Sequence, residues 1–158
     1  MKSQSIKFLL VFLFASSFLN AQIIKGQKPL ENVPPIVNAA FINQFAGKDV
    51  TWFTRFQGRY NGEQVYEGRF LFDNRYSSAV YTKNGSLVAF VTAIEYTEIP
   101  KYARDYLDVN FPGRAIIDSV LVTRGGDDVT YEIGIYLDNQ FVVKVFSKNG
   151  EFIKGVRG

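Results

Sequence analysis

Apolar residues recur with a helical period in two segments of the chain. Both segments place apolar side chains at i, i+3, i+4 and i+8: Val37, Ala40, Phe41 and Phe45 in one, Ala103, Tyr106, Leu107 and Phe111 in the other. This spacing puts the four side chains of a segment on one stripe of an α-helix. Prolines at 34, 35 and 100 favour a helix start, and glycines at 47 and 113 favour its end. Each predicted helix must therefore lie against an apolar surface.

Runs rich in β-branched and aromatic residues follow each predicted helix. They predict strands at 49–57, 65–72, 76–83 and 87–96 after the first helix, and at 114–124, 129–137, 141–147 and 152–156 after the second. Hairpin turns are indicated at Asn61-Gly62, Asn84-Gly85 and Asn149-Gly150, because Asn and Gly tolerate the positive φ of a tight turn.

The pattern of helix and strands occurs twice. Shifting the chain by 66 residues, and by 65 after one deletion, aligns Pro34 with Pro100, Asp73-Asn74 with Asp138-Asn139, and Lys83-Asn84-Gly85 with Lys148-Asn149-Gly150. We therefore predict an α+β fold: two tandem helix-plus-antiparallel-strand repeats, 34–98 and 99–158, with the helices packed on one face of an antiparallel sheet. The repeats share one sheet or form two abutting sheets. The shared sheet is favoured because two separate units of this size would each be marginally stable.

Side-chain alternation predicts the register of the second hairpin. A three-residue loop over 138–140 opposes Leu137 to Phe141 and keeps apolar side chains on one face. A two-residue loop would oppose Ile133 to Lys144 and mix the faces, since a one-residue slip moves every side chain to the other side. We therefore expect three-residue loops in both hairpins.

The sheet face left uncovered by the helices is the candidate binding surface. We predict that a protein partner contacts Tyr81, Tyr136, Lys144, Phe146, Glu67, Arg69 and Glu132. Rigid aromatic side chains flanked by charges are typical anchors of protein interfaces. The alternative is that these rings only stabilise neighbouring strands. Trp52 and Phe53 are adjacent on one strand, so one of them is expected to face outward.

The first 21 residues have the pattern of a cleaved secretory signal peptide. Lys2 and Lys7 form a basic start, 8–19 are apolar apart from two serines, and Ala21 suits a cleavage site. An apolar stretch of this length is too short to cross about 30 Å of hydrocarbon. The chain has no cysteine, so it is not expected to be a lipoprotein. We predict a lead at 22–33, a domain at 34–158, a periplasmic or secreted location, and no stable membrane anchor after cleavage.

Composition narrows the possible chemistry. The chain has no histidine and no cysteine, which excludes Ser-His-Asp and Cys-His nucleophiles and His or Cys zinc sites. Two of the 18 basic residues lie in the signal segment, leaving 16 against 15 acidic ones. These charges are scattered, which disfavours nucleic-acid binding. We predict no cofactor, no metal site and no catalytic residue.

Two pairs of carboxylates in the sequence bear on this prediction. Asp127-Asp128 lacks the spaced oxygen ligands that calcium needs, so a turn is favoured there. Glu67 and Glu132 occupy matching positions of the two repeats and would act together only if they converge to about 5–10 Å, as glycosidase carboxylates do. The chain is therefore not expected to be an enzyme.

The duplicated motif resembles the PepSY-like domains of secreted bacterial proteins, which are grouped with the beta-lactamase-inhibitor-like fold. It consists of a prolyl helix ending in Phe-x-Gly-basic, then Val50-x-Trp52, a Tyr-Glu strand, a short hairpin and a strand ending at Asn-Gly, over about 33–156. The resemblance implies an extracytoplasmic location, no catalytic residues and an exposed sheet face that grips a protein. The chain lacks the inhibitors' cysteines and has no matching inhibitory loop.

The combined prediction is an exported non-catalytic binding module. It contacts an extracytoplasmic protein partner through the open sheet face, and inhibition of a peptidase or hydrolase is one form of this hypothesis. The alternative is a carbohydrate or small-ligand binding protein of the cell envelope.

Overall fold

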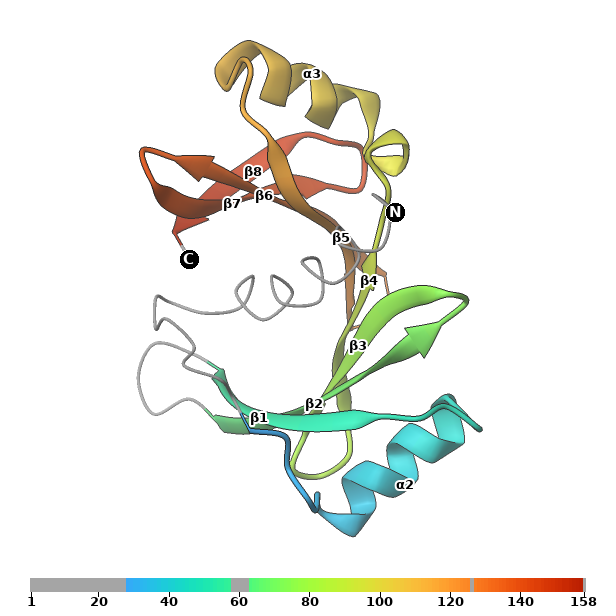
Figure 1. The fold of residues 1–158 in the computed structure, drawn as a ribbon. Coiled ribbons are helices and arrows are strands. Elements are labelled where there is room, and N and C mark those ends of the chain that lie inside the picture. The colour runs from blue at the N-terminus through green and yellow to red at the C-terminus, as the bar shows by residue number, and fades with distance from the viewer. Residues whose placement is uncertain (1–27, 58–62, 126, 158) are drawn as a thin grey trace, which may run out of the picture. The chain divides into compact units, whose positions relative to one another are not determined.

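The computed structural model describes residues 28–57, 63–125 and 127–157. In chain order its elements are α2 (Pro35–Gln44), β1 (Thr51–Gln57), β2 (Glu63–Phe72), β3 (Arg75–Thr82), β4 (Leu87–Ala93), the 3-10 turn η1 (Tyr96–Glu98), α3 (Lys101–Asn110), β5 (Ile116–Arg124), β6 (Asp128–Leu137), β7 (Gln140–Ser147) and β8 (Phe152–Arg157) (Figure 1). The predicted signal peptide at 1–21 and the predicted turn at Asn61-Gly62 lie outside the described residues.

The strands form one eight-stranded sheet in the order β1-β2-β3-β4-β5-β6-β7-β8. The predicted fold class, two tandem helix-plus-antiparallel-strand repeats, was therefore wrong. Most described residues lie in strands, and the two α-helices among them have ten residues each. A continuous sheet is physically favourable because each strand satisfies the backbone groups of the next, whereas separate sheets would leave additional unpaired edges.

Two compact units divide the described chain. Residues 28–57, 63–92, 123–125 and 127–128 form the α2 unit, and 93–122 and 129–157 form the α3 unit. Each unit has its own apolar cluster beneath its helix. We call the sheet side that carries this cluster the helix side of the unit, and the opposite side its reverse side.

The α2 unit is held together by aromatic packing. Val37 and Phe41 are buried on α2, and the Phe41 ring meets those of Trp52 and Phe70 edge-on, at centroid distances of 5.5 and 4.9 Å. Edge-to-face contacts of this kind add to the stabilisation that comes from burying apolar area. The helix starts at consecutive prolines, and Gly47 follows its end with φ of +72°. The short helix is thus fixed by its ends and by one buried stripe.

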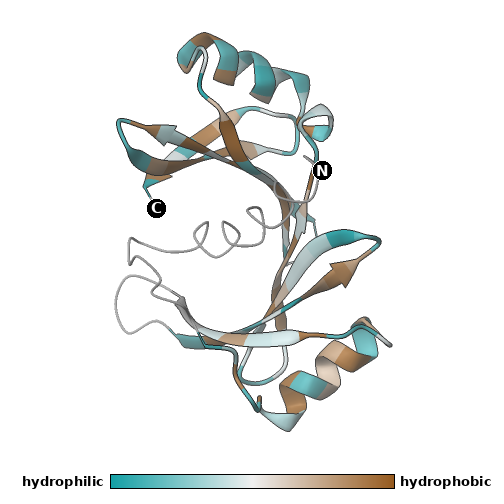
Figure 2. Cartoon of the chain, in the orientation of Figure 1, coloured by the Kyte–Doolittle hydropathy of each residue, from teal (hydrophilic) through white to brown (hydrophobic). Residues whose placement is uncertain are grey.

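The α3 unit has a more polar helix over an equally apolar floor. Ala103 and Leu107 face down onto Ile133 and Phe146, and all four side chains are buried. The outer surface of α3 carries an exposed ion pair between Lys101 and Asp105. Figure 2 shows this contrast, with α3 coloured largely hydrophilic and much of the underlying strand surface hydrophobic.

The β6–β7 hairpin has a two-residue turn, so the predicted three-residue loop was wrong. Leu137 pairs with Gln140, and Ile133 pairs with Lys144. The turn residues Asp138 and Asn139 both have positive φ, at 50° and 61°. A turn with two left-handed residues matches the twist of the flanking strands, and Asp and Asn tolerate that conformation better than most residues.

The β2–β3 hairpin has the same geometry. Phe72 pairs with Arg75 across Asp73 and Asn74, whose φ values are 48° and 61°. The mixed face that argued against this register is tolerated in the second hairpin because the Lys144 ammonium lies 4.5 Å from the centroid of the Phe111 ring. The correction moves every side chain of the second strand of each hairpin, β3 and β7, to the opposite side of the sheet.

Candidate functional site

Three of the predicted contact residues, Tyr81, Lys144 and Phe146, lie on the helix side of their units. Tyr81 and Phe146 have no exposed surface and belong to the two cores. The assignment of these three residues to an uncovered face was therefore wrong, because it rested on the wrong hairpin register.

Tyr81 keeps one polar contact inside the α2 unit. Its hydroxyl donates a hydrogen bond to Gln44 Oε1 at 2.8 Å, and burial raises the pKa of Tyr81 to about 12. A buried phenol with a satisfied hydroxyl is a structural group. It ties the last turn of α2 to the sheet.

The other predicted contact residues, Glu67, Arg69, Glu132 and Tyr136, lie on the reverse sides. Their pairs with Val80, Ser78, Val145 and Phe141 on the neighbouring strands establish this placement. Glu67 and Glu132 are buried, whereas Tyr136 is 48% exposed. Contact of these four residues with a partner stays a prediction.

A charged cluster occupies the reverse side of the α2 unit. Arg69 Nη2 donates to Glu67 Oε2 at 3.0 Å, and the Arg69 guanidinium carbon lies 4.0 Å from the centroid of the Phe53 ring. Glu67 is 1% exposed. A buried carboxylate is costly unless it is paired, and a planar guanidinium can pair with it while stacking on an aromatic ring. The cluster orders this side of the sheet.

The same cluster explains the two adjacent aromatic residues of β1. We expected either Trp52 or Phe53 to face outward, but both are buried. Trp52 packs against Phe41 on the helix side, and Phe53 lies under Arg69 on the reverse side. Alternation along the strand was correct, and the assumption of an uncovered reverse side at this position was not.

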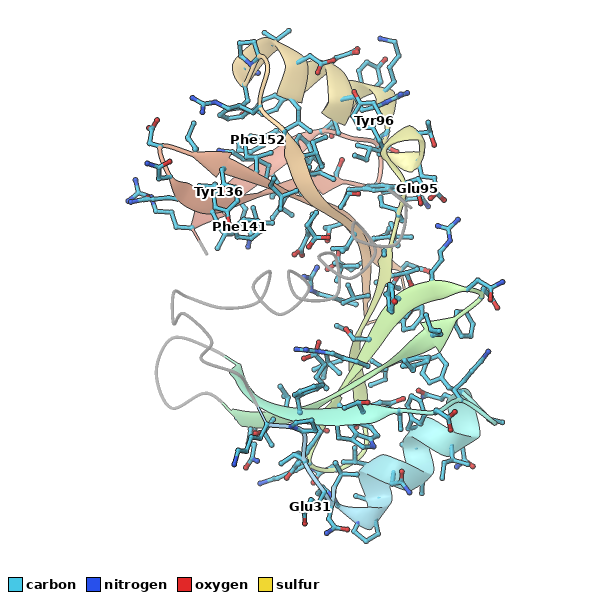
Figure 3. The ribbon with its side chains drawn as sticks, viewed as in Figure 1. Glu31, Glu95, Tyr96, Tyr136, Phe141 and Phe152 are labelled. Carbon is cyan, nitrogen blue, oxygen red and sulfur yellow. The ribbon has the colours of Figure 1, made fainter. Side chains whose placement is uncertain are left out.

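The reverse side of the α3 unit carries an aromatic pair close to the hairpin turn. Tyr136 and Phe141 are directly opposite each other, with ring centroids 5.8 Å apart and an interplanar angle of 69°. Figure 3 shows both side chains on the β6–β7 hairpin, away from Phe152. We call Tyr136 and Phe141 the tip pair.

Gly134 makes room for the tip pair. A Cβ atom at this position would lie 2.5 Å from Phe141 Cζ, closer than real contacts allow. The Phe141 ring therefore covers the backbone at Gly134 and backs the Tyr136 ring from the side. The result is a supported aromatic side chain with half of its surface open to solvent.

A similar apolar pair occurs at the tip of the β2–β3 hairpin. Leu71 and Tyr76 are directly opposite each other on the reverse side, and Leu71 is exposed. Sequence reasoning named Tyr136 as a contact residue but placed Phe141 and Tyr76 beneath the helices, so it missed the pairing at both tips. The signal that would have found them was the pair of adjacent Asp and Asn residues, which favours a two-residue turn.

The described residues lack two kinds of feature, a metal-binding cluster and a membrane-spanning helix. Residues 28–57, 63–125 and 127–157 contain no cluster of three or more Asp, Glu, His or Cys side chains arranged to hold a metal ion. In the same ranges, no helix has the length and apolar character needed to cross a membrane.

Comparison with known proteins identifies the fold. No family model and no curated protein matches the chain. Among solved structures, a proposed periplasmic protein of Bacteroides eggerthii is 14% identical with a TM-score of 0.68, and the match covers 80% of this chain and 89% of that one. A DUF2874 family protein of Bacteroides uniformis is 16% identical with a TM-score of 0.66, covering 80% and 90%.

A BLIP-like protein of Bacteroides fragilis is also similar, with 11% identity, a TM-score of 0.63 and coverage of 81% of this chain and 88% of that one. At this level of identity the likeness establishes the fold and nothing further. None of these three structures is described as PepSY-like, so the predicted resemblance to PepSY-like domains is not confirmed. The chain has the fold shared by DUF2874 and BLIP-like proteins of Bacteroides.

Proposed function

We propose that this chain is an exported, non-catalytic, PepSY-like binding module that contacts an extracytoplasmic protein through the tip pair. The observation that carries the proposal is the half-exposed Tyr136 ring held against Phe141 over Gly134. Aromatic side chains dominate the binding energy of protein interfaces, and a ring that is already fixed loses little entropy on binding.

The surroundings of the tip pair suit a protein interface. The exposed turn residues Asp138 and Asn139 border the pair on one side. Further along the reverse side, Lys154 lies opposite Val145 on the edge strand. An apolar centre with a polar rim is the usual arrangement of a contact surface.

Sequence pattern and fold together support the location and the class of function. Residues 1–21 have the signal-peptide pattern and the chain has no cysteine, which favours release into the periplasm or medium over a lipid anchor. The similar structures include a proposed periplasmic protein and a BLIP-like protein. Restraint of a peptidase or hydrolase by the bound module is the specific form of the proposal.

Site-specific crosslinking tests this proposal. A photoreactive phenylalanine analogue is placed at position 136, and in a matched protein at position 102, where Tyr102 is more exposed but lies on α3. The proposal predicts that one envelope protein is crosslinked in the cell from position 136 and not from position 102. Equal yields from both positions, or no adduct from position 136, would refute it.

A further inference from the structure

The two edge strands of the sheet differ in how they are protected. β1 and β8 lie at the two ends of the strand order. On β1, the Leu30 amide donates a hydrogen bond to the Trp52 carbonyl at 2.8 Å, so the preceding segment covers part of that edge. In the described part of the chain, β8 pairs with β7 and with no second strand.

Most side chains of β8 are exposed to solvent, and none of them is acidic. Five of its six residues are exposed, including Phe152 and Ile153. Lys154 and Arg157 provide two positive charges, and the strand has no acidic residue. A third cation lies close by, since Lys144 is paired with Gly155 across the ladder. The edge therefore combines unpaired backbone groups with a positive flank.

The ladder is regular where these charges lie. The register shift between Val145 and Phe146 is confined to the start of β8, and Gly155, Val156 and Arg157 pair in sequence with β7. Alternation then places Lys154 and Val156 on the reverse side, and Arg157 on the helix side. An added strand would meet at least one cation on each side of the sheet.

We infer that β8 binds an extended protein segment in which acidic and apolar residues alternate, by addition of that segment as a further strand. Backbone hydrogen bonds to the open edge would supply the general attraction, as in other strand-addition complexes. Alternation puts all acidic side chains of the segment on one side of the sheet. They would pair with Lys154 if that is the reverse side, leaving the apolar ones to contact Phe152, or with Arg157 if it is the helix side, leaving the apolar ones to contact Val156. The positive charge of β8 therefore favours an acidic segment over a neutral or basic one.

A second copy of the chain fits this edge less well than an acidic segment does. Two β8 strands side by side would bring two copies of Lys154 and Arg157 within about 10 Å, where repulsion is not fully screened. Lysine on an edge strand commonly prevents such self-pairing. The same positive charge attracts an acidic strand. The β8 edge therefore disfavours pairing with a second copy of β8 and favours pairing with an acidic partner.

This inference goes beyond the contact proposed for the tip pair. Strand addition uses the backbone of β8 and can occur whether or not Tyr136 contacts a protein. Amide chemical shifts separate the two, because strand addition perturbs residues 152–157 and tip contact perturbs residues near 136 and 141.

The test uses two labelled peptides with the same length and apolar content. One is acetyl-Thr-Val-Glu-Val-Glu-Val-Thr-amide, and the other has lysine in place of both glutamates. Fluorescence anisotropy with the protein is expected to show at least about tenfold tighter binding of the acidic peptide, since each exposed ion pair contributes modestly and the lysine peptide is repelled. Amide shifts on titration are expected at 152–157.

Charge-reversal variants of β8 provide a second test of the inference. K154E/R157E is expected to invert the peptide preference, whereas K28E/K83E, which changes the net charge equally at exposed positions in the α2 unit, preserves it. K154Q/R157Q serves if charge reversal impairs folding, and it is expected to abolish the preference. Equal binding of both peptides, no binding of the acidic one, shifts outside 152–157, or dimerisation through β8 in sedimentation would each overturn the inference.

Discussion

Tyr136 and Phe141 face each other across the β6–β7 ladder on the side away from α3, at a centroid distance of 5.8 Å. Their contact depends on this register, because a three-residue loop would place the two side chains on opposite faces of the hairpin. It also depends on Gly134, whose missing Cβ leaves space for the Phe141 ring. Turn chemistry and one small residue therefore create the exposed aromatic group on which the proposed function rests.

The placement of Phe146 in the core predicts a large loss of stability on truncation. Phe146→Ala is expected to lower the free energy of unfolding by about 3–5 kcal/mol, because the ring is fully buried beneath α3. Tyr136→Ala is expected to cost about 1 kcal/mol or less, since half of its side chain is already in water. Urea denaturation of both variants measures the difference. Similar losses would mean that the two residues do not differ in burial.

The left-handed turn predicts a specific order of stabilities at position 139. Asn139→Ala is expected to cost about 1 kcal/mol, because alanine is strained at a φ of 61°, whereas Asn139→Gly is expected to be neutral or stabilising. Thermal unfolding of the two variants beside the unmodified protein provides the comparison. A three-residue loop without a left-handed residue here would make alanine as good as glycine.

Burial of the Tyr81 phenol predicts a loss of stability at high pH. Its pKa is raised from 10.0 to about 12 in the folded protein, so the unfolded chain releases this proton first. The corresponding stabilisation is fully present below pH 10 and is lost as the pH rises through 12. Urea denaturation between pH 9 and pH 12 should therefore show a steeper decline for the unmodified protein than for Tyr81→Phe.

Tyr102→Phe is the matched control for the alkaline measurement. Tyr102 is an exposed tyrosine on α3, so its replacement is expected to leave the steep decline unchanged. Tyr81→Phe also loses the hydrogen bond to Gln44, which lowers its stability already at neutral pH, so the slopes above pH 9 are compared rather than the absolute stabilities. A decline of equal steepness in all three proteins would contradict the burial of the Tyr81 hydroxyl.

The ion pair on the reverse side of the α2 unit predicts strong coupling between its members. Glu67→Leu alone is expected to cost about 3 kcal/mol, because it removes the buried carboxylate that accepts the hydrogen bond from Arg69. Adding Arg69→Met should recover part of that loss. A double-mutant cycle measures the coupling, and the exposed Lys101–Asp105 pair, expected to contribute about 0.5 kcal/mol or less, is the control. Equal coupling in both pairs would contradict the account.

Local structure could be predicted well from the sequence because its signals are local. Consecutive prolines and the following glycine located α2, and the apolar spacing identified Val37 and Phe41 as its buried stripe. The strand segments were also found within a few residues of their observed limits. These features depend on backbone conformation and on one amphipathic pattern at a time.

The faces of β3 and β7, the second strand of each hairpin, could not be predicted in this way, because they depend on one residue of loop length. Both registers left plausible apolar pairs, and the one with Lys144 opposite Ile133 was rejected as mixing polar and apolar positions. The sequence did not reveal that the Phe111 ring would lie beside the Lys144 ammonium. The error moved Tyr81 and Phe146 from the core to the surface, and Phe141 from the surface to the core.

The prediction of the fold class was wrong for a different reason. Duplication of a motif indicates how many similar segments exist, but it does not determine how their strands connect. Hydrogen bonding continues from strand to strand and favours one sheet of eight.

The affinity of the Tyr136→Ala protein for the partner crosslinked at position 136 tests the central claim most directly. Calorimetry with the purified partner is expected to show binding at least about tenfold weaker than for the unmodified protein, and unchanged binding for Tyr102→Ala. Both variants are expected to melt within a few degrees of the unmodified protein. Undiminished affinity of a folded Tyr136→Ala protein would contradict the claim that this ring anchors the interface.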